Sequence, residues 1–213
     1  VCFAVLPLSQ VAASVINTCG SRARLVVCLA FPTVPVNAAS AGVLAVESTL
    51  GTLYSPTFTP DKQHCIGNYS AQQFSYAVRN GVLPDGSRLY PAMPYPDYAK
   101  ISDEDLHALY VYFMQGVKPD SAQPPETKLS FPFSQRWGMR FWNWAFTSDK
   151  PFQPLGGASA EVNRGAYIVE SLGHCGSCHT PRGLGMNEKE LASSDDRFIA
   201  GGSLNNWEVP SLR

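Results

Sequence analysis

Apolar residues recur with helical spacing in three stretches of the chain, and segments rich in Gly and Pro separate these stretches. In the first stretch, Phe74 and Val78 lie four positions apart and so share one helical face. Ser70, with Gln73 three positions later, has the pattern of a capping box. The pattern therefore predicts a helix that begins after Ser70 and ends before Gly81.

The two later helices each begin after a serine that can cap the first turn. Ser102 is followed by three carboxylates, which the helix dipole favours at this end, and Gly116 ends the stretch. Ser159 is expected to cap a third helix, which runs through Leu172 and delivers Cys175 at its end. The stripe expected to be buried on the second helix comprises Leu106, Leu109, Tyr110, Phe113 and Met114.

The segments around these helices are mostly loops and linkers. Residues 44–60 are rich in Thr and Ser, and we expect an extended loop there with a strand around 52–54. Residues 117–128 and 148–158 have the composition of linkers. Residues 131–146 between them are predicted to form a helix packed across two domains, with a ligand site and a docking surface as the alternatives. The aromatic residues on which this interpretation depends are Trp137, Phe141, Trp142 and Trp144.

Composition and charge exclude several classes of protein. The 213 residues carry a formal net charge of −1, so nothing indicates a nucleic-acid partner. No apolar run approaches the roughly 20 residues of a membrane-spanning helix. Residues 1–13 are apolar enough to be the remnant of a signal peptide, although they lack a starting Met and a basic lead-in. The alternative is that these residues carry no information about targeting.

The strongest chemical signal is the string Cys175-Gly-Ser-Cys-His179. Two thiols at this spacing can form thioethers with a porphyrin, and the adjacent imidazole can bind its iron, so the pattern is typical of c-type haem attachment. A thioredoxin-like dithiol would need a preceding strand, where this chain predicts a helix. A zinc site would need a second ligand pair, for which only His64 and Cys65 are candidates. A chance pair of buried cysteines is the remaining alternative.

A methionine loop lies in the first half of the chain, in the string Tyr90-Pro-Ala-Met-Pro-Tyr-Pro96. Prolines on both sides of Met93 stiffen the loop, which suits a thioether held toward a metal. With other strings, this segment makes the chain resemble the multi-haem cytochrome c subunits of membrane-bound bacterial alcohol, gluconate and sugar-alcohol dehydrogenases. The matching strings are residues 50–55, 59–62, 66–70, 80–86, 89–98, 131–139, 163–167, 173–182 and 207–213.

The resemblance implies a role in electron transfer rather than substrate chemistry. Subunits of this family carry three haem c domains, on the periplasmic side of the inner membrane. They take electrons from a dehydrogenase catalytic subunit, with a flavin or quinone cofactor, and pass them toward ubiquinone. The chain is accordingly expected to be an electron-transfer subunit of an oxidoreductase acting on CH–OH donors, without catalysis of its own.

The chain departs from the family pattern at the first attachment motif. Cys28 stands at the first cysteine position, but Phe31 replaces the second cysteine and Pro32 replaces the histidine. Phe31 cannot form a thioether and Pro32 offers no lone pair to iron, so the first haem site is expected to be disabled. Met93 is then the inherited axial ligand of that degenerate site. One haem c is expected, anchored by Cys175 and Cys178, with His179 as the proximal iron ligand.

These observations predict an all-α, loop-rich fold made of cytochrome c-like domains. We expect a degenerate first domain over 1–117, a linker with the aromatic helix over 118–158, and the front part of a second domain over 159–213. In the family, the axial methionine of the second haem lies beyond residue 212, and Met186 is too near His179 to replace it. The chain is therefore interpreted as truncated. The alternative function is a non-redox remnant that acts only as an interaction module of the dehydrogenase complex.

Overall fold

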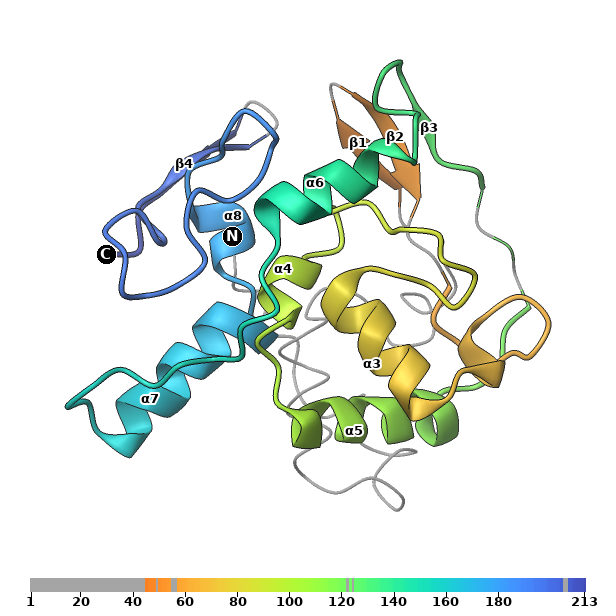
Figure 1. Cartoon of the computed structure of the whole chain (residues 1–213), viewed down its shortest axis with the longest axis horizontal. Helices are drawn as coiled ribbons and strands as arrows, with labels where there is room; N and C mark the ends of the chain where they lie inside the picture. The colour runs from red at the N-terminus through yellow and green to blue at the C-terminus, as the bar shows by residue number, and fades with distance from the viewer. Residues whose placement is uncertain (1–44, 49, 55–56, 122, 124, 205–206) are drawn as a thin grey trace.

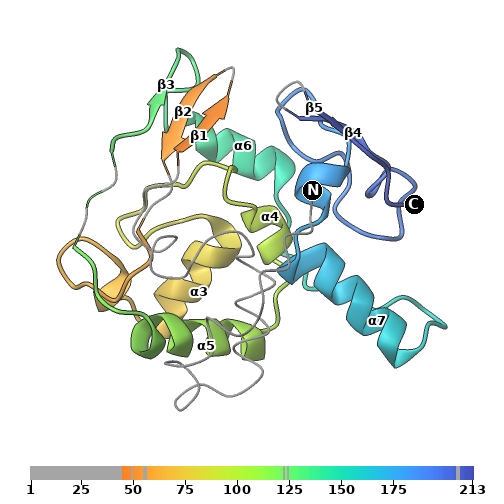
Figure 2. The ribbon, with the colours of Figure 1, turned by 180° about the vertical axis from the view of Figure 1, so that it is seen from behind.

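The computed structural model describes residues 45–48, 50–54, 57–121, 123, 125–204 and 207–213 (Figure 1). Its helices form two groups that lie side by side, with α6 (Gly138–Phe146) running above both. The group containing α3, α4 and α5 is called the N-terminal cluster here, and the group from α7 to β5 is called the C-terminal segment. Figure 2 shows the same arrangement from behind.

Two of the helices in the N-terminal cluster, α3 and α5, begin where the sequence predicts, whereas the short helix α4 between them is not predicted. After the short turn η1 (Ile66–Asn68), α3 spans Ala71–Asn80 and begins with the complete capping box of Ser70 and Gln73. Gly81 ends the helix in the left-handed conformation, at a φ of 62°. A one-turn helix, α4 (Tyr95–Tyr98), then leads into α5 (Asp103–Val111), whose first turn is capped by Ser102.

The predicted stripe of α5 forms much of the hydrophobic core. Leu106, Leu109 and Phe113 are buried, whereas Tyr110 and Met114 are only partly covered. The helix continues after Val111 as a wider π-helical turn, η2 (Tyr112–Gly116). Tyr112 is also buried, three positions after Leu109 on the same face, although it is not part of the predicted stripe.

The C-terminal segment begins with the helix predicted after Ser159. The Ser159 side chain accepts a hydrogen bond from the backbone N–H of Val162, and α7 runs over Ala160–Tyr167. A π-helical turn, η3 (Ile168–Leu172), extends it to the predicted end. The next helical turn is α8 (Gly176–His179), so helix rather than strand precedes the two cysteines.

The described part of the chain is mainly helical, as expected, but two small antiparallel sheets accompany the helices there, so the all-α class is not confirmed. The strand expected around 52–54 is confirmed as β2 (Gly51–Tyr54), which pairs with β1 (Ala45–Ser48) and β3 (Lys128–Leu129). The second sheet is a hairpin of β4 (Gly202–Leu204) and β5 (Trp207–Val209). All five strands have four residues or fewer, too short to produce a clear period-2 pattern in the sequence.

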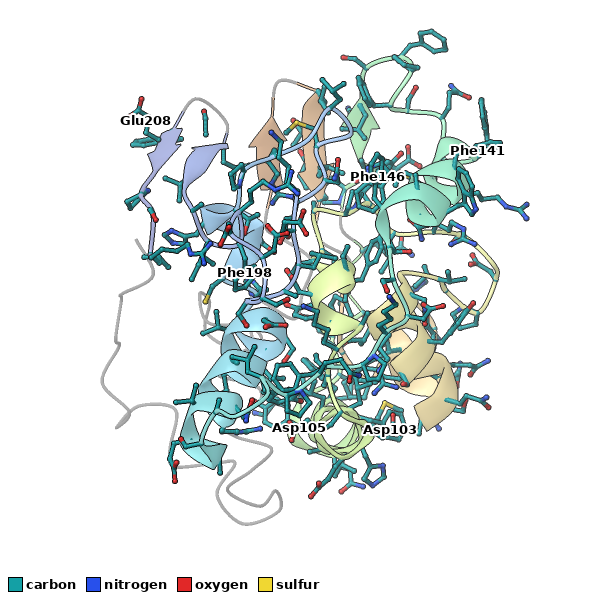
Figure 3. The ribbon with its side chains drawn as sticks, turned by 60° about the vertical axis from the view of Figure 1, so that its left-hand side comes forward. Asp103, Asp105, Phe141, Phe146, Phe198 and Glu208 are labelled. Carbon is teal, nitrogen blue, oxygen red and sulfur yellow. The ribbon has the colours of Figure 1, made fainter. Side chains whose placement is uncertain are left out.

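Helix α6 contacts both groups, but only part of its aromatic content does so. Trp142 is half-buried and donates a 2.7 Å hydrogen bond from Nε1 to the Gly185 carbonyl. Trp137, Phe141 and Trp144 are 66%, 65% and 84% exposed, and Phe141 projects away from the protein in Figure 3. The expectation that the whole aromatic segment packs is therefore wrong for these three residues, because they lie away from the face that contacts the neighbours.

A buried polar contact fixes α6 on the N-terminal cluster. The Tyr95 hydroxyl donates a 2.7 Å hydrogen bond to the side-chain oxygen of Asn143, whose amide nitrogen lies 3.3 Å from the carbonyl oxygen of Asn80. The domain boundaries proposed at 117 and 158 stay a prediction. In the described part of the chain, no helix is both long and apolar enough to cross a lipid bilayer.

Candidate functional site

The Cys-Gly-Ser-Cys-His string forms a single helical turn. The backbone N–H of His179 bonds the Cys175 carbonyl at 3.0 Å, and that of Cys178 bonds the same oxygen at 3.3 Å. Residues three and four apart in such a turn lie on neighbouring faces, so both thiols and the imidazole are held close together. Cys178 is exposed and Cys175 is half-buried, whereas His179 is only 5% exposed.

A backbone carbonyl far along the chain fixes the orientation of His179. Its Nδ1 lies 2.8 Å from the carbonyl oxygen of Pro210. A carbonyl oxygen can only accept, so Nδ1 carries the proton and the lone pair is on Nε2. This tautomer is the one in which Nε2 can bind a metal, and the carbonyl makes the ring a stronger ligand.

The hairpin of β4 and β5 holds Pro210 in place. The N–H of Gly201 bonds the His179 carbonyl at 2.7 Å, and the N–H of Ile199 bonds Oγ1 of Thr180 at 3.0 Å. Phe198, 2% exposed, packs below α8, where Gly176 leaves room for it (Figure 3). The loop before β4 and the residue after β5 thus together support the imidazole.

These residues fit covalent attachment of haem c. The thiols of Cys175 and Cys178 are not in disulfides, and the adjacent imidazole presents its Nε2 lone pair. The preceding helix removes the βαβ setting that a thioredoxin-like dithiol requires. The described residues contain no cluster of three or more His, Cys, Asp and Glu side chains that could hold a metal ion, so the zinc alternative gains no ligand set there.

The attachment turn rests on the N-terminal cluster through a buried carboxyl group. Ser177, between the two cysteines, donates a 2.7 Å hydrogen bond to Oδ2 of Asp97, which is 0% exposed. Burial raises the pKa of Asp97 well above its ordinary value, and the nearby Glu188 carboxyl raises it further. Burial likewise raises the pKa of Glu188, against the opposing effect of Arg182.

An ion pair with little exposure lies beside these carboxyls. Nζ of Lys100 lies 2.8 Å from Oε2 of Glu170, and it also donates to the Leu191 carbonyl. The ring of Tyr98 stacks edge-on against His174 at a centroid distance of 5.7 Å. The contact between the two groups of helices is therefore polar and charged as well as hydrophobic.

Met93 lies in the segment before α4, between Pro91 and Pro94, which line a small cavity with Arg182 and Glu188. It occupies a turn in which its N–H bonds the Tyr90 carbonyl at 3.2 Å, and its side chain packs against the hydrophobic core. Cys28, Phe31 and Pro32, which define the degenerate first site, lie outside the described residues. The inherited ligand role of Met93 therefore stays a prediction. Met186 is 46% exposed, in a tight turn after His179.

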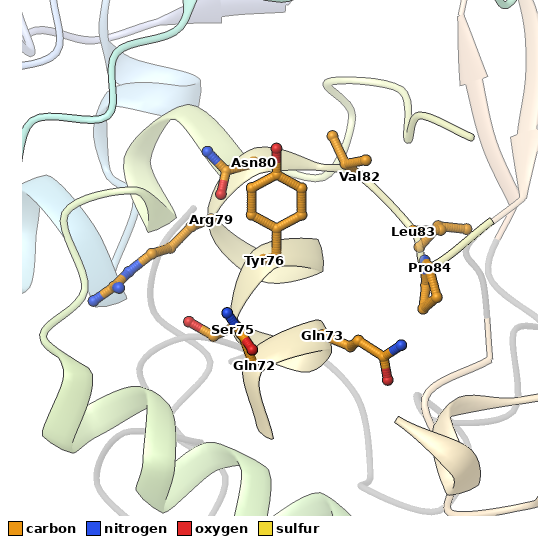
Figure 4. A pocket seen from close by; sticks show the side chains of 9 residues that line it. All are labelled: Gln72, Gln73, Ser75, Tyr76, Arg79, Asn80, Val82, Leu83 and Pro84. Atoms are coloured by element: carbon orange, nitrogen blue, oxygen red, sulfur yellow. The ribbon is translucent and has the colours of Figure 1, made fainter. Parts of the chain in front are cut away.

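A surface depression of about 450 Å³ lies along α3, away from the attachment turn (Figure 4). Tyr76 and Arg79 project from the helix on one side, and Leu83 and Pro84 lie on the other. It brings together no cysteine or histidine and adds nothing to the haem chemistry.

Three parts of the site escape analysis of the sequence. Pro210 lies in a string that resembles the family, but no local pattern pairs its carbonyl with His179. Asp97 also lies in a string that resembles the family, but nothing in the sequence pairs it with Glu188, which lies 91 positions later. Only the fold shows that all three lie around one helical turn.

The attachment turn has the residue pattern of a c-type cytochrome, and comparisons with known proteins indicate the same class. No family model matches the chain. It is 46% identical over 194 residues to the cytochrome c subunit of a quinone-dependent alcohol dehydrogenase from Gluconacetobacter polyoxogenes. The aligned residues make up 90% of this chain and 42% of the relative. It is 41% identical over 215 residues to the gluconate 2-dehydrogenase cytochrome c subunit of Pantoea cypripedii, covering 99% of this chain and 49% of that protein.

A third relative is a diheme c-type cytochrome from Cereibacter sphaeroides, 38% identical over 159 residues, which cover 74% of this chain and 51% of the relative. Over most of its length the chain is thus homologous to proteins named as cytochrome c subunits of dehydrogenases, as the resemblance indicates. It spans about half the length, or less, of these relatives.

Proposed function

We propose that the chain carries one haem c, covalently bound to Cys175 and Cys178 with His179 as the proximal ligand, and that it transfers single electrons. The observation that supports this most directly is the 2.8 Å contact between His179 Nδ1 and the Pro210 carbonyl, next to two thiols on one helical turn. The bound haem would supply a one-electron couple between ferric and ferrous iron. The residues of the chain anchor it and orient its ligand.

The partner proposed is a dehydrogenase catalytic subunit with a flavin or quinone cofactor, because two relatives are named as cytochrome c subunits of dehydrogenases. We propose that electrons pass from that subunit toward ubiquinone, at the periplasmic side of the inner membrane. The motif chemistry supports this location, since c-type haem is attached outside the cytoplasm. Nothing in the net charge of −1 favours a nucleic-acid partner.

The direct test is expression in a bacterium with the c-type maturation machinery, followed by intact mass and a pyridine haemochrome assay. The expected result is one covalent haem per chain, lost in a Cys175→Ala, Cys178→Ala double variant. Cys65→Ala is the matched control, because Cys65 has no attachment motif. The mass of a bare chain would overturn the proposal, and two haems would show that the first site still functions.

An interaction module without redox activity is the second candidate function. The observation that favours it is the exposure of Trp137, Phe141 and Trp144 on α6, since exposed aromatic side chains are frequent at protein interfaces. Trp144→Ala should then abolish binding of the catalytic subunit, measured by co-purification, while folding is retained. Trp142→Ala is unsuitable as the test, because Trp142 bonds Gly185 and stabilises the fold.

A further inference from the structure

We propose that Asp97 and Glu188 share one proton against the attachment turn, and that this pair tunes the midpoint potential of the haem bound there. The two carboxyls lie where the N-terminal cluster meets the C-terminal segment. Asp97 Oδ1 and Glu188 Oε2 are buried, and neither has a hydrogen-bond partner in the described part of the chain. The part of the proposal that concerns the haem rests on the proposed function, whereas the sharing of the proton does not.

A shared proton accounts for both unpartnered oxygens. Buried polar atoms are nearly always hydrogen-bonded, and two carboxylates cannot bond each other without a proton between them. Two neighbouring carboxylates in a buried site also repel, so only one of them ionises readily. A proton on Asp97 Oδ1 directed at Glu188 Oε2 would satisfy both atoms at once.

The surrounding charges indicate which carboxyl holds the proton. Arg182 Nη1 lies 3.9 Å from Oε1 of Glu188, which favours the charged form of that group. Lys100 is paired with Glu170 at 2.8 Å. With Asp97 neutral, the two cations balance the two anions, and ionisation of Asp97 would add an unbalanced buried charge.

The other groups around the pair leave this balance unchanged. Ser177 donates to Asp97 Oδ2 and so favours the charged carboxyl, but the opposing effects of burial and of Glu188 are larger. Burial raises the pKa of Tyr98 far above the physiological range, and Tyr98 therefore stays neutral. The charge of Arg182 is also close to the attachment turn, because its guanidinium donates to the Ser177 carbonyl.

The pair is joined directly to the residues between the two thiols. Ser177 bonds Asp97, and a Cβ on Gly176 would lie only 2.6 Å from Glu188 Oε2. A haem on Cys175 and Cys178 therefore has this proton site next to its anchoring turn. One-electron reduction adds negative charge, so the pair binds its proton more tightly. At pH values where the oxidised protein has lost this proton, the pair takes it up from water as the electron arrives.

The experiment measures the midpoint potential of the haem-loaded chain against pH by spectroelectrochemistry. The potential should fall as pH rises through the range in which the folded pair loses its proton, which lies above the ordinary Asp pKa of 3.8. The slope should be below the value for a fully linked step, about 59 mV per tenfold change in proton concentration. Asp97→Asn and Glu188→Gln should each flatten this slope. Asp196→Asn, at a fully exposed side chain, should keep the wild-type slope.

Infrared spectroscopy of the chain at neutral pH supplies a measurement that does not depend on haem. A C=O band of a protonated carboxyl should be present in the wild type and absent from both Asp97→Asn and Glu188→Gln. Loss of the band in the variants supports the shared proton even in a chain that binds no haem. The lack of haem would overturn only the proposed function. A haem-loaded wild type with a potential independent of pH would overturn the tuning role, and an absent band would overturn the shared proton.

Discussion

The Tyr167 hydroxyl donates a 2.7 Å hydrogen bond to Oδ2 of Asp105, which is 0% exposed. This contact joins α7 to the first turn of α5, 62 positions earlier in the chain. The same hydroxyl accepts the N–H of Ser102 at 3.0 Å. One side chain therefore connects the helix that leads to the attachment turn with the cap of the helix at the centre of the core.

Tyr167→Phe should lower the free energy of unfolding by about 1–3 kcal/mol, because the buried Asp105 carboxylate loses one of its hydrogen-bond donors. The measurement is urea unfolding followed by circular dichroism. Tyr76→Phe is the control, since Tyr76 is 53% exposed and should give almost no change. Equal losses in both variants would show that the buried hydrogen bond contributes nothing specific.

Gly81→Ala should destabilise the chain more than Gly86→Ala. Both glycines have positive φ, 62° and 81°, so both substitutions carry the backbone cost of about 1–2 kcal/mol. Only at Gly81 would the new Cβ meet a side chain, 2.7 Å from the Tyr95 ring, whereas nothing lies within 4 Å at Gly86. Thermal unfolding of the two variants measures the difference, and an equal fall in Tm would contradict the expected clash.

The stability of the chain should decrease as pH rises through the range in which Asp97 ionises. The pKa of Asp97 is raised above 3.8 in the folded state, so the folded chain binds more protons than the unfolded chain in this range. The stabilisation is complete below 3.8 and is lost as pH rises through the folded pKa. Asp97→Asn cannot ionise and should become more stable relative to wild type as pH rises.

This prediction is measured as the difference in unfolding free energy between wild type and Asp97→Asn over a pH series. The difference removes the contribution of exposed groups such as Asp85, whose pKa is lowered mainly by hydrogen bonds from Ser87. A difference that stays constant from acidic to neutral pH would contradict the raised pKa.

Substitutions of two neighbouring tryptophans should separate packing from exposure on α6. Trp142→Ala should cost about 2 kcal/mol or more, because the ring loses its contacts with Tyr95 and Phe146 and the Gly185 carbonyl loses its donor. Trp144→Ala, at 84% exposure, should change the free energy of unfolding by less than about 0.5 kcal/mol. Similar losses at both positions, measured by urea unfolding, would contradict the orientation of α6.

The sequence by itself determined the local features of this protein. The caps at Ser70, Ser102 and Ser159 and the spacing of apolar residues determine where the helices begin, because these interactions join residues within one helical turn. The attachment string is equally local, since its chemistry depends on residues within five consecutive positions. Sequence was sufficient for these features because no distant residue takes part in them.

Only the tertiary structure decided the rest. Strands of two to four residues gain their stability from pairing with distant partners and leave almost no periodic signal. The contact of His179 with Pro210, the proximity of Asp97 to Glu188 and the outward face of α6 depend on how the helices pack. Packing energies are set by neighbours in space rather than in sequence, and these relationships therefore became visible only in the folded chain.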